Sequence, residues 1–506
     1  MTLDNSRLRS RAIMSDDCAA LTLPALLQVE DESALLDYAC ADTGILLWPH
    51  LRTVFYRMAL ADFLYGAPLT GGSRTAVPLS RIAAYFIRAI WHNSVSHAMG
   101  RSAADVCLIS SSVGHQIRQG RVFNRLSDHF AMQHTARSIT IEEHFEWQWQ
   151  QQRHNDRVLL HAPLQVANTI GSRLALRSRH RAIASELVAF VSERAENLLG
   201  WRPGPKREAA LIDLAMRKLA GMPQQILSYD KILKKIQPKV ILVLGASYGP
   251  ASTLIVAARM RGIVTAEFQH GAIAPGHDGY NFAPTMRNSK QYQCSLPEHF
   301  LSYGAWWNGT INAPINMVAI GNPHRDQHLL RSTNGTECRR SVLLLSDGID
   351  FDLYLQLARE ITAPLAAQGL RVMIRPHPVE RSAIKIKYGQ CIDASIELDL
   401  RDDLYASLRN SYAVVSELST GLFEAVGIAH KLFVWDTPKA RFCFPTLPFD
   451  GFTSADTLIQ LLQQDGAGEL SAAQVEAFWA TNWEANYREF LEANCGVTMS
   501  MESTHV

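Results

Sequence analysis

The sequence predicts an α/β protein with two Rossmann-like domains, each a doubly wound parallel sheet, that face each other across a cleft. Three observations lead to this prediction. The chain has 506 residues, too many for one ordinary core. Short apolar runs that end in small polar residues alternate with segments of helical periodicity. A polar stretch at 324–340 interrupts this alternation, which then starts again.

Composition narrows the function classes. The chain is 47% hydrophobic and carries 49 basic against 48 acidic residues, a balance that argues against a general nucleic-acid binder. Its eight cysteines form no C-x-x-C pair, so they indicate a reducing cytoplasm rather than a zinc module or a disulfide framework. The N-terminus lacks the apolar core of a signal peptide, and no apolar run reaches the ~20 residues of a membrane span. We expect a soluble, cytoplasmic protein.

Residues 1–100 are expected to form a helical extension. Two amphipathic segments stand out in it, "LLWPHLRTVFYRMALADFLYG" and "LSRIAAYFIRAIWHNSVSHAM". Their aromatic and basic side chains suit a peripheral contact with the inner membrane, but they suit packing against the next domain as well. We favour packing.

The first Rossmann-like domain is predicted at 101–325, on the acceptor side. Its clearest unit, "PKVILVLGASYGPASTLIVAARMRG", reads as strand, turn and helix. The second, a nucleotide-binding domain, is predicted at 326–455, with strands in "SVLLLSDG", "LRVMIRPHP", "YAVVSE" and "KLFVWD". Residues 456–506 should form helices that pack back on the first domain. Ligands bind at the carboxyl ends of strands in such sheets, so the site is expected between the domains.

The "RPHP" stretch ends a predicted core strand and supplies the first candidate residues. The two prolines fix the local backbone and so the directions of Arg375 and His377. A guanidinium is a fork-like donor to phosphate oxygens, and an imidazole adds another donor. We therefore expect Arg375, His377 and Pro378 to line a phosphate site. A proline-stiffened loop with a surface histidine is the alternative.

Two further strand ends in the second domain carry candidates for binding the nucleotide. Ser419, Thr420 and Gly421 open a predicted helix, where unpaired N–H groups and hydroxyls favour an anion, and Glu424 follows one turn later, suited to ribose hydroxyls. An ordinary helix cap explains the same residues. The "SDG" turn adds Ser346 and Gly348, beside a nucleotide or in a plain tight turn.

In the first domain, "EFQHGAIAPGHDGYNFAP" places polar groups on a loop after a strand. Acid–base side chains on a loop that faces the cleft are what an acceptor hydroxyl needs for deprotonation. We expect His270 or Asp278 to be the general base. The remaining candidates on the acceptor side are Gln269, Gly271, His277 and Tyr280. The "LGASYGPAS" turn lacks the spacing of a dinucleotide fingerprint.

Together "QHG…PGHDGY", "PEHFLSYG", "VAIGNPHRD", "RPHP" and "SELSTGLFEA" resemble bacterial GT-B glycosyltransferases of capsule and lipopolysaccharide synthesis that use CMP-linked ulosonic acids. By this resemblance His377 and Pro378 match a His-Pro pair beside the CMP phosphate, and Ser419 and Thr420 match a hydroxyl motif. Teichoic-acid glycerophosphotransferases that use CDP-glycerol share a similar layout. The acidic Asp/Glu-Asp/Glu-Gly element of several sialyltransferases has no match in the first domain.

These observations predict a metal-independent glycosyltransferase. Its donor would be a nucleotide sugar, bound as co-substrate with no other cofactor, and its acceptor a bacterial surface glycan or its lipid-linked precursor. His377 would help to stabilise the leaving phosphate, a catalytic role. The alternatives are a UDP-sugar 2-epimerase-like enzyme, a CDP-glycerol-type phosphotransferase and a non-catalytic scaffold that binds nucleotide sugars.

Overall fold

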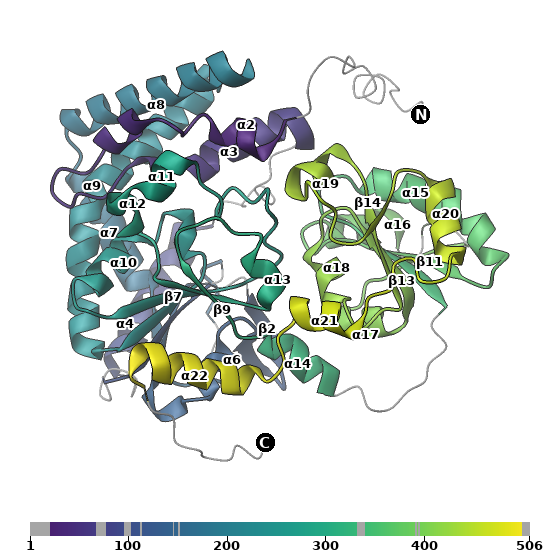
Figure 1. The fold of residues 1–506 in the computed structure, drawn as a ribbon. Helices are drawn as coiled ribbons and strands as arrows, with labels where there is room; N and C mark the ends of the chain where they lie inside the picture. The colour runs from purple at the N-terminus through teal and green to yellow at the C-terminus, as the bar shows by residue number, and fades with distance from the viewer. Residues whose placement is uncertain are drawn as a thin grey trace.

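The computed structural model describes residues 21–66, 77–95, 103–111, 114–144, 146–149, 152–330, 340–389, 392 and 395–497. Two parallel sheets, each covered by helices, form two domains side by side (Figure 1). The predicted fold class, two Rossmann-like domains in a GT-B-like arrangement, is confirmed.

The first sheet has seven parallel strands in the order β5-β4-β1-β6-β7-β8-β9. The chain first builds outward from β1 through β4 to β5, then returns to the other side of β1 for β6 and the strands after it. This reversal is the switch point at which such sheets bind ligands. The strands are β1 (Val106–Ser110), β4 (Ser138–Glu142), β5 (Val158–Leu160), β6 (Val240–Val243), β7 (Val264–Phe268), β8 (His299–Ser302) and β9 (Asn316–Ala319). A hairpin of β2 (His115–Arg118) and β3 (Arg121–Asn124) follows β1.

The second sheet repeats this topology with six parallel strands in the order β12-β11-β10-β13-β14-β15. Its switch point lies between β10 and β13. The central strands are almost wholly buried, and they are rich in Val, Leu and Ile, as parallel strands covered on both faces are. The strands are β10 (Ser341–Leu345), β11 (Arg371–Arg375), β12 (Ile396–Leu398), β13 (Ser411–Ser416), β14 (Lys431–Trp435) and β15 (Asp450–Phe452).

Helices cover both sheets. In the extension and first domain they are α2 (Leu23–Leu27), α3 (Arg52–Leu60), α4 (Leu79–Val95), α6 (Asp128–Met132), α7 (Ala162–Leu174), α8 (Ser178–Leu199), α9 (Pro205–Ile236), α10 (Ser252–Arg259), α11 (Pro284–Asn288), α12 (Lys290–Gln293), α13 (Ala305–Asn308) and α14 (Pro323–Leu330). In the second domain they are α15 (Phe351–Ala366), α16 (Arg381–Tyr388), α17 (Leu404–Arg409), α18 (Thr420–Glu424), α19 (Pro438–Cys443) and α20 (Ala455–Gln463).

The helical extension is tied to the first domain by a buried ion pair. Arg52 of α3 donates to Glu30 over 2.8 Å, and both side chains are almost wholly excluded from solvent. The same guanidinium donates to the carbonyls of Asp278 and Asn281, while Glu30 also accepts from the amide of Ala283. The pair therefore fixes the 278–283 loop of the first domain from outside its sheet.

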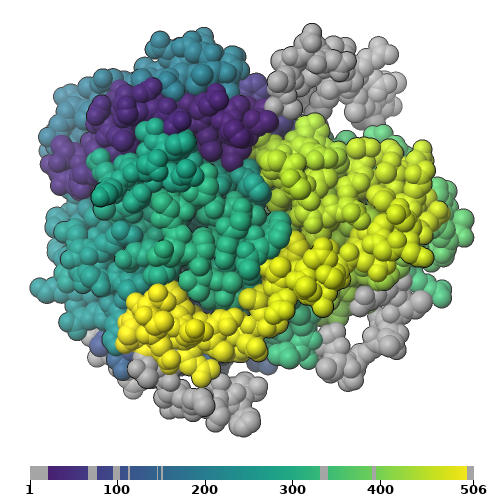
Figure 2. Space-filling model, viewed as in Figure 1, coloured from purple at the N-terminus to yellow at the C-terminus, as the bar shows by residue number. Residues whose placement is uncertain are grey.

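The C-terminal segment returns to the first domain, but later than the predicted residue 456. Leu458 and Leu462 of α20 pack into the core of the second domain. The return is made by α21 (Ala472–Phe478) and α22 (Trp483–Cys495). Tyr487 and Leu491 of α22 are buried in the core of the first sheet. Figures 1 and 2 show the C-terminal helices, in yellow, lying against both domains. The apolar face of α20 thus belongs to the second domain, and only the later helices cross.

Among the described ranges, no helix combines the length and the apolar character that a bilayer crossing requires.

Removing the buried guanidinium should be costly. Arg52→Met would leave the carboxylate of Glu30 buried without its charged partner, so we expect the free energy of unfolding to fall by about 3 kcal/mol. Denaturant titration measures this loss, and hydrogen exchange should become faster at residues 278–283. The control is Arg202→Ala, which removes exposed ion pairs with Glu196 and Glu208 and should cost less than about 1 kcal/mol. Equal losses in both variants would contradict the role given to Arg52.

Candidate functional site

The carboxyl ends of the two sheets meet at the domain interface. The amide of Ala272, in the loop after β7, donates to the hydroxyl of Thr420 at the start of α18, over 3.3 Å. Farther along the same loop, the amide of Gly276 donates to the carbonyl of Cys443 over 2.8 Å. The hydroxyl of Tyr65, from the extension, lies 3.9 Å from the sulfur of Cys443. Three parts of the chain thus converge on one place, as the sequence predicted for the two strand ends.

Gln269 and Gly271 shape the turn that carries His270. The side-chain amide of Gln269 donates to the carbonyl of Gly271, and its oxygen accepts from the amide of Tyr303. A Cβ on Gly271 would lie 3.3 Å from the hydroxyl oxygen of Thr420, a tight contact. These two residues therefore brace the turn and allow the domains to approach at the place where the sequence analysis expected the acceptor side.

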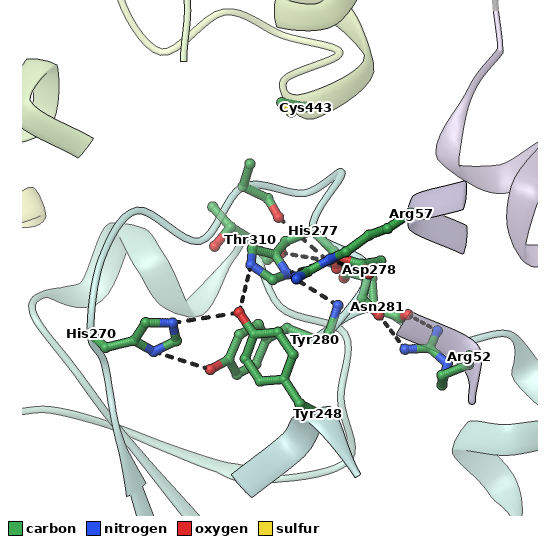
Figure 3. A network of polar contacts seen from close by, with 12 residues as sticks. Arg52, Arg57, Tyr248, His270, His277, Asp278, Tyr280, Asn281, Thr310 and Cys443 are labelled. Carbon is green, nitrogen blue, oxygen red and sulfur yellow. Dashed lines mark hydrogen bonds and ion pairs between the residues drawn. The ribbon is translucent and has the colours of Figure 1, made fainter. Parts of the chain in front are cut away.

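A chain of hydrogen bonds runs through the polar loop (Figure 3). The amide of Gly279 donates to Nδ1 of His277, so the neutral ring of His277 carries its hydrogen on Nε2. That nitrogen lies 3.0 Å from the hydroxyl of Tyr248, to which it donates. The hydroxyl hydrogen of Tyr248 is then directed to Nε2 of His270, 3.5 Å away.

The chain continues from His270 to a buried carboxylate. Nδ1 of His270 lies 3.5 Å from the hydroxyl of Tyr280, which donates to Glu267 over 2.5 Å. Glu267 also accepts from the amide and hydroxyl of Ser247. Burial raises the pKa of Glu267 to about 7, against the donated hydrogen bonds that lower it. The amide of Gly279 can only donate at one end of these hydrogen bonds, and Glu267 accepts at the other end, so every hydrogen bond between them points the same way. The ring of His270 therefore carries its hydrogen on Nδ1, and Nε2 is its basic nitrogen.

Burial keeps the two histidines neutral. It lowers the pKa of His270 and that of His277 to about 4, because a low-dielectric environment disfavours the imidazolium. The neutral form is the one that can accept a proton, and the lowered pKa makes the ring a weaker base than an exposed histidine. His270 has the chemical state that a general base requires.

Asp278 is arranged differently. Its carboxylate pairs with Arg57 of α3 over 3.2 Å and is buried, and Figure 3 shows Arg57 reaching the loop from the extension. The ion pair engages the carboxylate that the sequence offered as a possible general base. Asp278 therefore holds Arg57 over the ring of Tyr248, 5.5 Å from its centre.

In the second domain, His377 lies against the turn after β10. Gly348 has φ of +81°, and a Cβ there would lie 2.8 Å from Nδ1 of His377, so only glycine leaves room for this ring. Nδ1 accepts from the amide of Val379 over 3.4 Å, which leaves the hydrogen of the neutral ring on Nε2. Ser346 donates to Glu380, and Pro378 is exposed. The structure thus places Ser346, Gly348 and His377 side by side.

Arg375 is engaged elsewhere. Its guanidinium is buried and donates to Asp399 over 3.0 Å and to Ser407 over 3.1 Å. A phosphate contact would have to compete with this buried ion pair. The geometry assigns Arg375 to holding β11 against the start of α17, in place of the phosphate contact that its sequence position suggested.

The hydroxyl turn is ordered by its own hydrogen bonds. Ser419 accepts from the amide of Gly421, and the side chain of Thr420 faces the first domain. Glu424 is buried 3.7 Å from Arg125, which follows β3 of the first domain. Its carboxylate thus bridges the two domains, a different partner from the ribose predicted for it.

Several residues of the site were missed by the sequence analysis. Lys439 of α19 pairs with Glu417 over 2.6 Å and with Asp347 over 3.4 Å, beside His377. It follows the strand "KLFVWD", so the rule that polar groups after strands line the site could have found it. Arg57, Arg125 and Tyr248 gave no comparable signal. Among the described residues no cluster of His, Cys, Asp and Glu is arranged to hold a metal ion.

Comparisons with known proteins give similarity of fold alone. No protein-family model matches the chain, and no curated protein matches it in sequence. Solved structures with a similar fold include an inferred UDP-N-acetylglucosamine 2-epimerase from Listeria monocytogenes (12% identity over 79% of this chain and 98% of that chain, TM-score 0.40). The glycotransferase of kitacinnamycin (12% identity, 78% and 95%, TM-score 0.38) and the wall teichoic acid polymerase TagF soaked with CDPG (10% identity, 81% and 96%, TM-score 0.37) are others. Scores this low carry no argument about substrates.

The buried histidines should make stability depend on pH. The ordinary pKa of histidine is about 6.5, so between about pH 4 and 6.5 the unfolded chain binds protons at His270 and His277 that the folded chain does not. The free energy of unfolding should therefore rise with pH across this window. We expect a shallower rise in His270→Gln/His277→Gln, measured by denaturant titration at several pH values. An unchanged slope would contradict the burial of these rings.

Proposed function

We propose that the protein is a glycosyltransferase that takes a sugar from a nucleotide donor held by the second domain and passes it to an acceptor hydroxyl activated by the first. The observation that carries this proposal is the contact between Ala272 and Thr420. It joins the turn that holds a neutral, oriented imidazole to the hydroxyl turn at the switch point of the other sheet. Both parts are where Rossmann-like sheets bind their ligands.

On the donor side, the proposal uses the turns after β10, β11 and β13. Nε2 of His377 carries the ring hydrogen and can donate to a phosphate oxygen, and the hydroxyls of Ser419 and Thr420 are further donors. Donors fixed in place before the reaction stabilise the negative charge that grows on a leaving phosphate. Gly348 supports this arrangement because it allows the imidazole to lie against its turn.

On the acceptor side, His270 is the proposed base. Asp278 was the other candidate from the sequence, but its carboxylate is bound by Arg57. The acceptor hydroxyl would displace the hydroxyl of Tyr248 from Nε2 of His270, give its proton to that nitrogen and attack the anomeric carbon, while the bond from that carbon to the phosphate oxygen breaks. The hydrogen on Nδ1 stays directed at Tyr280, whose hydroxyl is held by Glu267. This orients the ring and stabilises the imidazolium that forms.

The finer assignment rests on the motifs in the sequence. We propose a CMP-linked ulosonic acid as donor, a bacterial surface glycan or its lipid-linked precursor as acceptor, and transfer without a metal ion. The His-Pro pair at 377–378 and the hydroxyls at 419–420 support this choice, since they resemble the CMP-binding elements of the transferases described above.

Two substitutions test the division of roles. His377→Ala should weaken nucleotide binding and abolish transfer, whereas His270→Gln should abolish transfer and keep nucleotide binding. Binding is measured by thermal shift with CMP, CDP, UDP, GDP and TDP. A nucleotide present at a hundred times its dissociation constant should stabilise the protein by about 2.7 kcal/mol. Transfer is measured as release of the nucleotide in the presence of acceptor.

Other outcomes would contradict the proposal. Full transfer activity in His377→Ala would show that the donor phosphate is not bound at His377 of the second domain. Conversion of UDP-N-acetylglucosamine to its epimer without acceptor would identify an epimerase. Tight binding of a nucleotide with no turnover in any acceptor mixture would identify a scaffold.

Glu267 should act on the reaction through Tyr280 and His270 as a positioning residue. Tyr280→Phe removes the oxygen that faces Nδ1 of His270 and keeps the ring that packs on Phe300. We expect kcat to fall by about tenfold to a hundredfold, within the range that general acid–base catalysis contributes. KM for the donor should stay unchanged, and the acidic limb of the pH–rate profile should shift. Equal loss of kcat and donor affinity would instead indicate a structural role.

A further inference from the structure

The outward face of α4 is apolar. Toward the protein, α4 buries Tyr85 and Ala89, and His92 and Asn93 bond to the backbone of the edge strand β5. The opposite face exposes a stripe of large side chains at helical spacing. The exposed fractions are 83% for Leu79, 66% for Ile87, 44% for Ile90 and 65% for Trp91. A helix that only packs against its own domain would carry polar residues on this face.

Neighbouring helices also expose apolar side chains. α4, α7 and α9 lie along one side of the first domain (Figure 1). α7 exposes Ile170 and Leu174, and α9 exposes Leu227. Exposed apolar side chains gathered on one side of a folded protein indicate an interaction surface.

The charges on α4 and α7 have one sign. Leu79–Val95 and Ala162–Leu174 contain no Asp or Glu, and they carry exposed Arg81, Arg88 and Arg173. α9 adds the exposed Lys231, and its Asp230 is paired with Arg261 over 2.7 Å. An apolar stripe with a tryptophan, flanked by arginines, is the pattern of a helix that lies in the interface of an anionic bilayer.

A cavity behind the same helices has matching chemistry. It has a volume of about 360 Å³ and is lined by apolar side chains of β4, β5, α7 and α9, including Ile139, Leu160 and Ile232. Lys231 and Lys235 are the charged side chains of its lining. Apolar walls with ammonium groups suit an anionic amphiphile such as a phospholipid.

We propose that the surface formed by α4, α7 and the adjoining part of α9 docks on an anionic lipid bilayer. The apolar stripe inserts among the acyl chains near the headgroups, and the arginines contact lipid phosphates. This proposal goes beyond the transferase reaction and uses none of its residues. It adds membrane contact to the packing that was expected for the second amphipathic segment of the sequence. In the structure, one face of α4 packs against the first domain and the other face is exposed.

Vesicle flotation of the full chain tests the docking. We expect the protein to float with vesicles of phosphatidylcholine and phosphatidylglycerol at low salt, and to be released by high salt or by vesicles of phosphatidylcholine alone. Ile87→Glu/Trp91→Glu should lower the fraction bound by about tenfold or more, because it removes apolar contacts and adds negative charge. Leu330→Glu/Ile386→Glu makes the same change at exposed sites elsewhere and should bind as the unchanged protein does.

Circular dichroism and the melting temperature show that each variant is folded. Failure of the unchanged protein to float with the anionic vesicles would overturn the proposal, as would equal losses in the two double variants. If sedimentation velocity showed a dimer that Ile87→Glu/Trp91→Glu dissolves, the surface would bind a second copy and the proposal would be wrong. Nucleotide binding and transfer in detergent-free solution are measured separately, so their failure would affect the transferase proposal alone.

Discussion

The buried pair of Glu30 and Arg52 is the constraint on which the acceptor side of the protein depends. The loop after β7 has little regular structure between Gln269 and Ala283. It must nevertheless hold His270, His277 and Tyr280 in fixed positions relative to one another and to Tyr248, which follows β6. Its backbone carbonyls at 278 and 281 are held by a guanidinium from outside the sheet. The ion pair is fully satisfied, since Trp48 and the amide of Ala283 also donate to Glu30. Such a network adds specificity where a loop alone would offer many conformations.

The same extension gives the loop its electrostatic character. Arg57 pairs with Asp278 and lowers the pKa of both histidines, while the carboxylate of Asp278 raises the pKa of His277. Burial then dominates, and both rings stay neutral. Glu267 lies at the other end of the hydrogen-bonded chain, where burial acts in the opposite sense on an acid and favours its protonated form. Burial in the same low-dielectric environment thus keeps His270 neutral and brings the pKa of Glu267 near neutral pH.

The sequence predicted the fold because its signal is local: buried strands, small polar turns and periodic helices recur in order along the chain. It also named His270, His277 and Tyr280 as candidates on one loop, and the structure joins them through hydrogen bonds that include Tyr248. It could not show that Arg375 pairs with Asp399, or that Glu424 faces Arg125. Those pairs join residues far apart in the chain, and a charged residue after a strand looks the same whether a ligand or a distant side chain neutralises it. Arg57 was missed for the same reason.

The crossing of the C-terminal helices constrains how the two halves can move. α14 precedes the second domain in the chain and α21 leads back from it, and the two lie together where Arg325 of α14 is 4.8 Å from the ring centre of Trp479. Trp479 also donates to the carbonyl of Phe423 in the second domain. These contacts hold the two domains together along one border of the molecule. The two domains are held most firmly at this border. If they separate, the gap should therefore open first on the opposite side, where the amide of Gly276 donates to the carbonyl of Cys443.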